Sequence, residues 1–114
     1  MEDWMTALQI FEADAGALVM KPTAPRLDAI TARDVRADAV AAAANRSLVV
    51  IDLNDVNFID STGVGCLVSI LKALASGGQV RLVGIQPAVK ALLHLTRLDR
   101  VFQTFATVDA AIAA

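Results

Sequence analysis

Two hydroxyl side chains, Ser61 and Thr62, stand where a hydroxyl group can serve a chemical purpose. They follow an apolar, strand-like run and a short polar loop, and they come directly before an amphipathic segment with helical periodicity. Backbone N–H groups at a helix start lack internal partners, and the aligned peptide dipoles leave partial positive charge there. A hydroxyl at this position either caps the helix or accepts a phosphate group, which the positive helix end tolerates. Both roles are open from the residues alone, and Thr62 could cap the helix while Ser61 is modified.

Other kinds of site find weaker support in the sequence. Asp52, Asp55 and Asp60 carry oxygen ligands of the kind that Mg²⁺ binds, but their spacing across a strand–loop junction is unremarkable, so we expect no metal site. Asp60 is better placed to orient the following hydroxyl or to cap the helix. The loop contains no complete phosphate-binding glycine motif. The only histidine, His94, lies between leucines without a metal-binding or catalytic partner, so we expect neither an enzyme nor a cofactor.

The length and composition narrow the class of protein. A chain of 114 residues is long enough for one hydrophobic core, and we expect a single domain over residues 1–114. The formal net charge of -2 and the 4% content of aromatic residues do not favour binding to nucleic acid. No apolar run reaches the roughly 20 residues that span a bilayer, and the first residues lack the pattern of a secretory signal. The single cysteine, Cys66, excludes an internal disulfide and falls on the apolar side of its helix. We therefore expect a cytoplasmic protein without membrane insertion.

Strand and helix signals alternate along the chain. Strands are predicted around Leu8 and Ile10 and at residues 17–20, 48–53, 79–85 and 101–105. Helices are predicted from Asp28 or Thr31 to Ala44, from Ser61 to Gly77, from Pro87 through Thr96, and over residues 108–113 behind a Thr107 cap. Because helices between strands imply crossover connections, we expect an α/β fold with a mostly parallel central sheet, an antiparallel N-terminal hairpin and about four helices. In such sheets functional groups gather beyond the carboxyl ends of strands, where residues 55–63 are expected.

The first predicted helix carries two further signals. Thr31 followed by Asp34 has the spacing of a cap and its acidic partner. Arg33, Asp34, Arg36 and Asp38 form a mixed charge run. A solvated helix face is the ordinary interpretation of such a run, and a rim that steers a partner is the alternative.

The helix after Ser61 is apolar over most of its circumference. Its small and polar residues recur at offsets of three and four and form one narrow stripe: Thr62, Gly65, Ser69, Lys72 and Ser76. The stripe has little side-chain bulk near its start, so the backbone of a partner could approach it closely. A solvent-facing stripe is the plain interpretation, and a docking surface is the alternative.

The sequences VVIDL at residues 49–53 and VNFIDSTG at residues 56–63 resemble the signature of STAS domains (sulfate transporter and anti-sigma factor antagonist). The chain is similar in particular to bacterial anti-sigma factor antagonists. The resemblance covers nearly the whole chain, since it also includes RLD at 26–28, VRLV at 80–83, PAVKALL at 87–93 and LDRVF at 98–102. Two positions depart from it: Pro25 replaces a common glycine in a loop often implicated in docking, and no glycine follows the third helix near Thr96 and Arg97.

The resemblance implies a protein that a kinase switches. In that family the serine after the aspartate, Ser61 here, is phosphorylated by an anti-sigma factor that is a serine kinase of the histidine-kinase-like ATPase fold. The unphosphorylated antagonist binds the anti-sigma factor and frees a sigma factor, the phosphorylated form lets go, and a PP2C-type phosphatase restores it. The residues expected at the partner-binding surface are Asp28, Asp60, Thr62, Gly63, Gly65 and Ser69.

Two other functions remain open at this point. A STAS-like structural subunit of a lipid-transport ATP-binding-cassette system would hold an ATPase permanently with the same surface. A nucleotide-binding sensor would need a phosphate-binding motif, which the sequence lacks. The first alternative is the stronger of the two.

Overall fold

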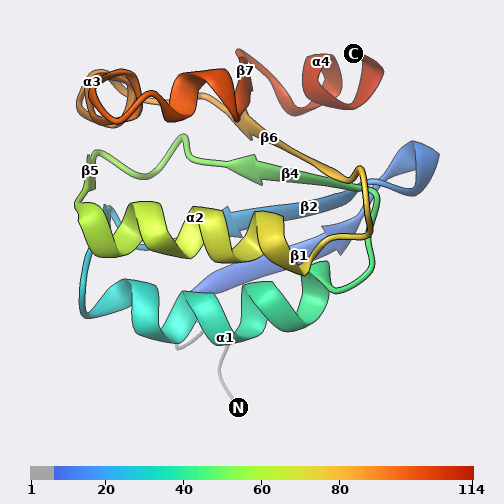
Figure 1. Ribbon diagram of the computed structural model, residues 1–114, viewed down its shortest axis with the longest axis horizontal. Helices are drawn as coiled ribbons and strands as arrows, with labels where there is room; N and C mark the ends of the chain where they lie inside the picture. The colour runs from blue at the N-terminus through green and yellow to red at the C-terminus, as the bar shows by residue number, and fades with distance from the viewer. Residues whose placement is uncertain (1–6) are drawn as a thin grey trace.

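A five-stranded sheet forms the centre of the computed structural model, which describes residues 7–114 (Figure 1). Its strands, in the spatial order β1-β2-β4-β6-β7, are β1 (Leu8–Glu12), β2 (Leu18–Pro22), β4 (Leu48–Asp52), β6 (Gln79–Val83) and β7 (Gln103–Phe105). β1 and β2 pair antiparallel around the short 3₁₀ segment η2 (Asp14–Gly16), and all other neighbours in this sheet pair parallel. The predicted sheet with its N-terminal hairpin is confirmed.

Helices cover both faces of this sheet, because β4 and β6 bury side chains on both sides. The helices are α1 (Thr31–Ala43), α2 (Ser61–Ala73), α3 (Pro87–Leu95) and α4 (Val108–Ala113). On one face Val49 and Ile51 join the main core with residues of α1, α2 and α3. On the other face Val50 and Val83 pack against Ala111 of α4. α1 and α2 lie side by side (Figure 1). No helix within residues 7–114 is long and apolar enough to cross a bilayer.

A second, two-stranded sheet was not predicted from the sequence. β3 (Arg26–Leu27) pairs parallel with β5 (Phe58–Ile59), so that Arg26 is opposite Phe58 and Leu27 is opposite Ile59. β3 comes shortly before α1, and β5 comes shortly before α2. This short ladder therefore brings the starting points of the two helices together at one end of the molecule (Figure 1).

Two predicted helix ends were wrong, and tertiary contacts explain the first. α2 ends at Ala73 and not at Gly77, because the Ala75 N–H donates to the carbonyl of Arg46 (2.9 Å) and the Ala73 carbonyl accepts from Asn45 (3.0 Å). α1 ends at Ala43 rather than one residue later. The predicted start of α3 at Pro87 and the Thr107 cap of α4 are confirmed.

The end of α3 shows the consequence of the missing glycine. Arg97 has a φ of 62°, a left-handed backbone conformation that favours glycine, and it leads into the 3₁₀ segment η3 (Leu98–Arg100). Thr96 is exposed and is the C-cap residue of α3, which ends at Leu95. The strands on either side are shorter than predicted, since β6 stops at Val83 and β7 starts at Gln103.

Candidate functional site

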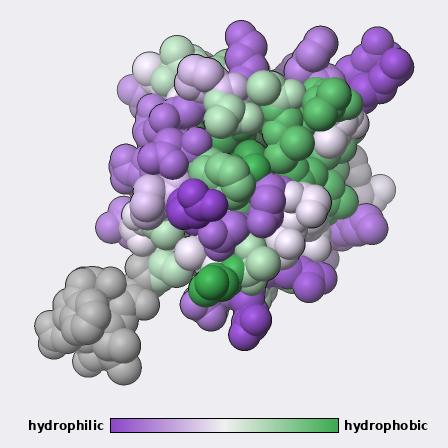
Figure 2. Space-filling model, turned by 90° about the vertical axis from the view of Figure 1, so that its left-hand side faces the viewer, coloured by the Kyte–Doolittle hydropathy of each residue, from purple (hydrophilic) through white to green (hydrophobic). Residues whose placement is uncertain are grey.

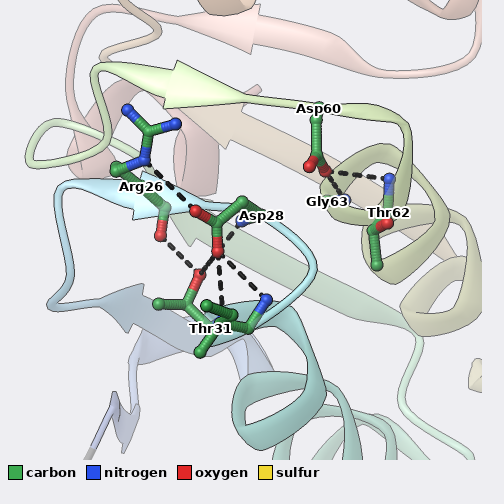
Figure 3. A network of polar contacts seen from close by, with 7 residues as sticks. Arg26, Asp28, Thr31, Asp60, Thr62 and Gly63 are labelled. Carbon is green, nitrogen blue, oxygen red and sulfur yellow. Dashed lines mark hydrogen bonds and ion pairs between the residues drawn. The ribbon is translucent and has the colours of Figure 1, made fainter.

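Ser61 is the first residue of α2, and its side chain is exposed. The residue before it, Asp60, occupies the N-cap position: one carboxylate oxygen, Oδ1, accepts from the N–H groups of Thr62 (2.9 Å) and Gly63 (3.0 Å) (Figure 3). Neither hydroxyl, of Ser61 or of Thr62, makes a hydrogen bond within residues 7–114. The alternative in which one of these hydroxyls caps the helix is therefore wrong, because the carboxylate of Asp60 already satisfies the exposed amides.

Because Asp60 caps α2 and the Ser61 hydroxyl does not, the two residues should differ in their effect on stability. Asp60→Ala should lower the free energy of unfolding by about 1 kcal/mol, because two amides of the first turn lose their acceptor. Ser61→Ala should change it by less than about 0.5 kcal/mol, because the hydroxyl has no partner in the described part of the chain. Chemical denaturation of both variants measures the difference. Equal losses in the two variants would show that the Ser61 hydroxyl supports the fold.

The start of α1 is closed by a reciprocal pair of hydrogen bonds. Asp28 Oδ1 accepts from the N–H of Thr31 (3.2 Å) and from that of Ile30 (3.1 Å), while Thr31 Oγ1 accepts from the N–H of Asp28 (3.0 Å). The bond from the Thr31 backbone and the guanidinium of Arg26 (3.2 Å) lower the pKa of the Asp28 carboxyl from its usual value. The capping pair is thus Asp28 with Thr31, and the predicted pair of Thr31 with Asp34 was wrong by one turn.

The two helix starts are joined through β3 and β5, so Asp28 and Asp60 lie on neighbouring segments (Figure 3). The N–H of Asp60 donates to the carbonyl of Leu27 (3.4 Å). Gly63 packs against the same carbonyl: a Cβ on this glycine would lie 2.1 Å from the oxygen of Leu27. Gly63 is buried and needed for packing, so it offers little surface to the partner that was predicted to contact it.

The end of the molecule that carries these helix starts faces the viewer in Figure 2. Hydrophilic side chains gather over the middle of this face, next to an apolar area. Ile30, beside Asp28, leaves 76% of its surface exposed, which is unusual for an isoleucine. Its exposure was missed from the sequence, where it follows the capping residue with no periodic signal. The N-termini of α1 and α2 therefore lie at the same end of the molecule, and the exposed Ile30 directly precedes the first of them.

A groove of about 460 Å³ runs between α1 and α2, starting beside Ser61. Its lining comprises Ala29, Ala32, Arg33, Arg36, Thr62, Gly65, Cys66 and Ser69. The Arg36 Nε donates to the Ser69 Oγ (3.2 Å) and bridges the two helices. The small-residue stripe of α2 thus faces a groove over Thr62, Gly65 and Ser69 rather than open solvent. The spacing of three between Arg33 and Arg36 is the sequence signal that places both on this side of α1.

The acids considered as metal ligands are engaged in separate interactions. Asp52 Oδ1 accepts from the side chain of Asn54 (2.7 Å), Asp55 pairs with Lys21 (3.6 Å), and Asp60 caps α2. The part of the chain that the structure describes contains no group of three His, Cys, Asp or Glu residues that could hold a metal ion.

Neither the thiol of Cys66 nor the imidazole of His94 has a part in the chemistry expected at Ser61. Cys66 is buried beneath the groove, and this burial raises the pKa of its thiol to about 11, so it stays protonated and unreactive at neutral pH. His94 is exposed, and its Nδ1 lies 3.0 Å from a carboxylate oxygen of Asp99. This contact links α3 to η3 at the surface.

Comparison with known proteins adds the following findings. A family model described as the STAS domain matches residues 10–111. A protein of Thermotoga maritima, described as an anti-sigma factor antagonist, is 41% identical over 61 residues. That match covers 53% of this chain and 54% of the relative, so it spans about half of the relative's length.

Solved structures show the same architecture over nearly the whole chain. The crystal structure of an anti-sigma factor antagonist of Thermotoga maritima has a TM-score of 0.81 at 27% identity, covering 93% of this chain and 92% of that one. The phosphorylated form of SpoIIAA, a cell fate determinant of Bacillus, has a TM-score of 0.72 at 22% identity and covers 94% of this chain and 97% of its own. The second likeness is one of fold alone.

Proposed function

This chain belongs to the STAS domain family, and we propose that it acts as an anti-sigma factor antagonist whose hold on its partner is released by phosphorylation of Ser61. The partner in this proposal is an anti-sigma factor that is also a serine kinase of the histidine-kinase-like ATPase fold. A PP2C-type phosphatase restores the binding form. The chain is the substrate of these enzymes and not an enzyme itself. The observation that carries the proposal is the exposed Ser61 hydroxyl, which has no hydrogen-bond partner among residues 7–114.

The fold is suited to carry the added charge. A phosphate adds about -1.5 to -2 charges at neutral pH. At Ser61 this charge stands at the N-terminus of α2 and near that of α1, where partial positive charges of the peptide dipoles favour it. Asp60 holds the first turn through backbone amides and does not depend on the hydroxyl. Phosphorylation is therefore compatible with an intact fold.

A bound partner covers this added charge and removes it from water. The carboxylate of Asp60 directly precedes Ser61, and that of Asp28, which pairs with Arg26, lies on the neighbouring segment that such a partner covers. A further dianion buried against that partner, without additional cations, loses its hydration and is repelled by its neighbours. Because the fold tolerates the phosphate and the interface does not, we expect phosphorylation to release the partner without unfolding the chain.

The comparisons support the class of partner and the kind of modification. The Thermotoga maritima relatives are described as anti-sigma factor antagonists. The SpoIIAA structure shows that a Bacillus protein of this fold exists in a phosphorylated form. No feature of residues 7–114 favours the alternative of a structural subunit in a lipid-transport system, which predicts that Ser61→Ala leaves function intact.

Phosphate mapping tests the proposal. Incubation with ATP and the histidine-kinase-like ATPase encoded nearest to this chain should place a single phosphate on Ser61, identified by mass spectrometry. Ser61→Ala should abolish the modification, because the acceptor oxygen is lost. Ser76→Ala serves as the matched control, since Ser76 is an exposed hydroxyl beyond the end of α2 and outside the predicted partner-binding surface, and it should keep the modification. A phosphate on any other residue, or one that persists in Ser61→Ala, contradicts the proposal.

A further inference from the structure

We propose that the groove between α1 and α2 binds an acidic segment of the same anti-sigma factor, whose carboxylates pair with Arg33 and Arg36. The inference rests on the proposed function. It adds that the groove is part of the contact surface and that the partner segment in it carries negative charge. The groove starts at Thr62, directly beside Ser61, so one partner can cover both.

Charge is distributed unevenly around α1. Arg33 and Arg36 line the groove, whereas Asp34 and Asp38 of the same charge run line neither this groove nor the two neighbouring hollows that Arg36 borders. Arg33 has no ion pair or side-chain hydrogen bond within residues 7–114, and Arg36 uses only its Nε, toward Ser69. The terminal nitrogens of both guanidinium groups are thus free for a ligand. The structure therefore favours the alternative of a partner-steering rim over a plain solvated face.

The spacing of these arginines indicates what they recognise. Residues three apart on a helix are neighbours on its surface, about 5–6 Å apart at Cβ. Planar guanidinium groups bind carboxylates through two parallel hydrogen bonds. Two acidic side chains one turn apart on a helix of the partner match this arrangement.

The floor of the groove leaves room for such a segment. Alanine side chains form part of its wall on one side, at Ala32 of α1 and at Ala29 just before this helix, and Gly65 forms part of its α2 wall. A Cβ on Gly65 would meet no atom within 4 Å, so packing within the protein does not explain this glycine. A glycine within a helix costs stability relative to alanine, and here it widens the groove. Gly63, two residues earlier, is by contrast fully explained by the carbonyl of Leu27.

The position of the groove couples it to the proposed switch. A phosphate on Ser61 would stand one residue from Thr62, which lines the groove. There it repels the carboxylates of an acidic occupant and offers the two arginines a competing anion. The groove therefore supplies a physical reason why phosphorylation at the end of α2 weakens a larger interface.

The test measures association and dissociation rates of the kinase from the phosphate-mapping experiment over a series of salt concentrations. Charge reversal of Arg33 and Arg36 to glutamate should slow association at least about tenfold at low salt and reduce its salt dependence. The matched control reverses Lys90 and Arg100, two exposed cations on α3 and η3, and should associate like the wild type. Gly65→Leu, which fills the groove, should speed dissociation while the chain remains folded by circular dichroism.

The outcomes separate this inference from the proposed function. If the kinase still phosphorylates Ser61 but the Arg33 and Arg36 variant associates like the control, the acidic-segment inference is wrong and the proposed function stands. Equal losses in the groove variant and the control variant would indicate only a general charge effect and would also overturn the inference. If the kinase neither binds nor phosphorylates the wild-type chain, both the proposed function and the acidic-segment inference are wrong.

Discussion

Gly63→Ala should lower the free energy of unfolding by about 3 kcal/mol, the largest effect that we expect from adding one methyl group to this chain. The added Cβ would lie 2.1 Å from the carbonyl oxygen of Leu27 and 2.6 Å from Cγ1 of Ile59. The first of these atoms belongs to the backbone of β3 and cannot rotate away. Either α2 or the β3–β5 ladder has to move, and both changes disturb the two helix starts.

Gly65→Ala is the matched control for this change, because it adds the same methyl group to the same helix. Its Cβ meets no atom within 4 Å, and alanine favours the helix more than glycine. The free energy of unfolding should therefore rise, by up to about 1 kcal/mol. Chemical denaturation of both variants gives the comparison. A loss of similar size at both positions would refute the packing role assigned to Gly63.

Phosphorylation of Ser61 should weaken binding of the anti-sigma factor at least about 100-fold, or about 2.8 kcal/mol. The reason is that a dianion must be covered in a region that already holds Asp28 and Asp60, where it also competes with the carboxylates of the partner for Arg33 and Arg36. Ser61→Asp should act in the same direction but less strongly, since its side chain carries one charge and not two. Titration calorimetry with the purified partner measures both affinities.

Two controls separate this effect from simpler explanations. Ser76→Asp adds the same charge at an exposed position beyond the end of α2, and it should leave the affinity unchanged. The phosphorylated protein should unfold within about 1 kcal/mol of the unmodified one, because the helix N-terminus compensates for the added charge. A weaker affinity that coincides with a large loss of stability would mean that the modification unfolds the site rather than repelling the partner.

The fold was predictable because its longer elements carry strong periodic signals. The apolar run of β4 and the amphipathic pattern of α2 gave the correct types and the correct start at Ser61. β3 and β5 were missed, because two-residue strands are too short to show any period. Their partners are distant in sequence, so only the folded chain reveals that they join the starts of α1 and α2.

The finer details of the candidate site depend on atomic contacts that cannot be read from the sequence. Asp60, Ser61 and Thr62 are all good capping residues, and the choice of Asp60 follows from its extended backbone conformation in the folded chain. Gly63 and Gly65 look equivalent in the sequence, yet only Gly63 lies against the carbonyl of Leu27. Asp28 was predicted as a partner-binding residue, and its role in closing α1 became apparent only from the geometry of Thr31.

The capping of α2 by Asp60 has a consequence for how this scaffold can change over evolutionary time. The neighbouring hydroxyl of Ser61 makes no hydrogen bond within the described residues, so mutation can remove or restore it while the fold stays intact. Under the proposed function, a change at this single codon would convert a regulated adaptor into one that stays permanently attached, and back again. Gene duplicates of such a domain are free to diverge in their regulation long before their architecture changes.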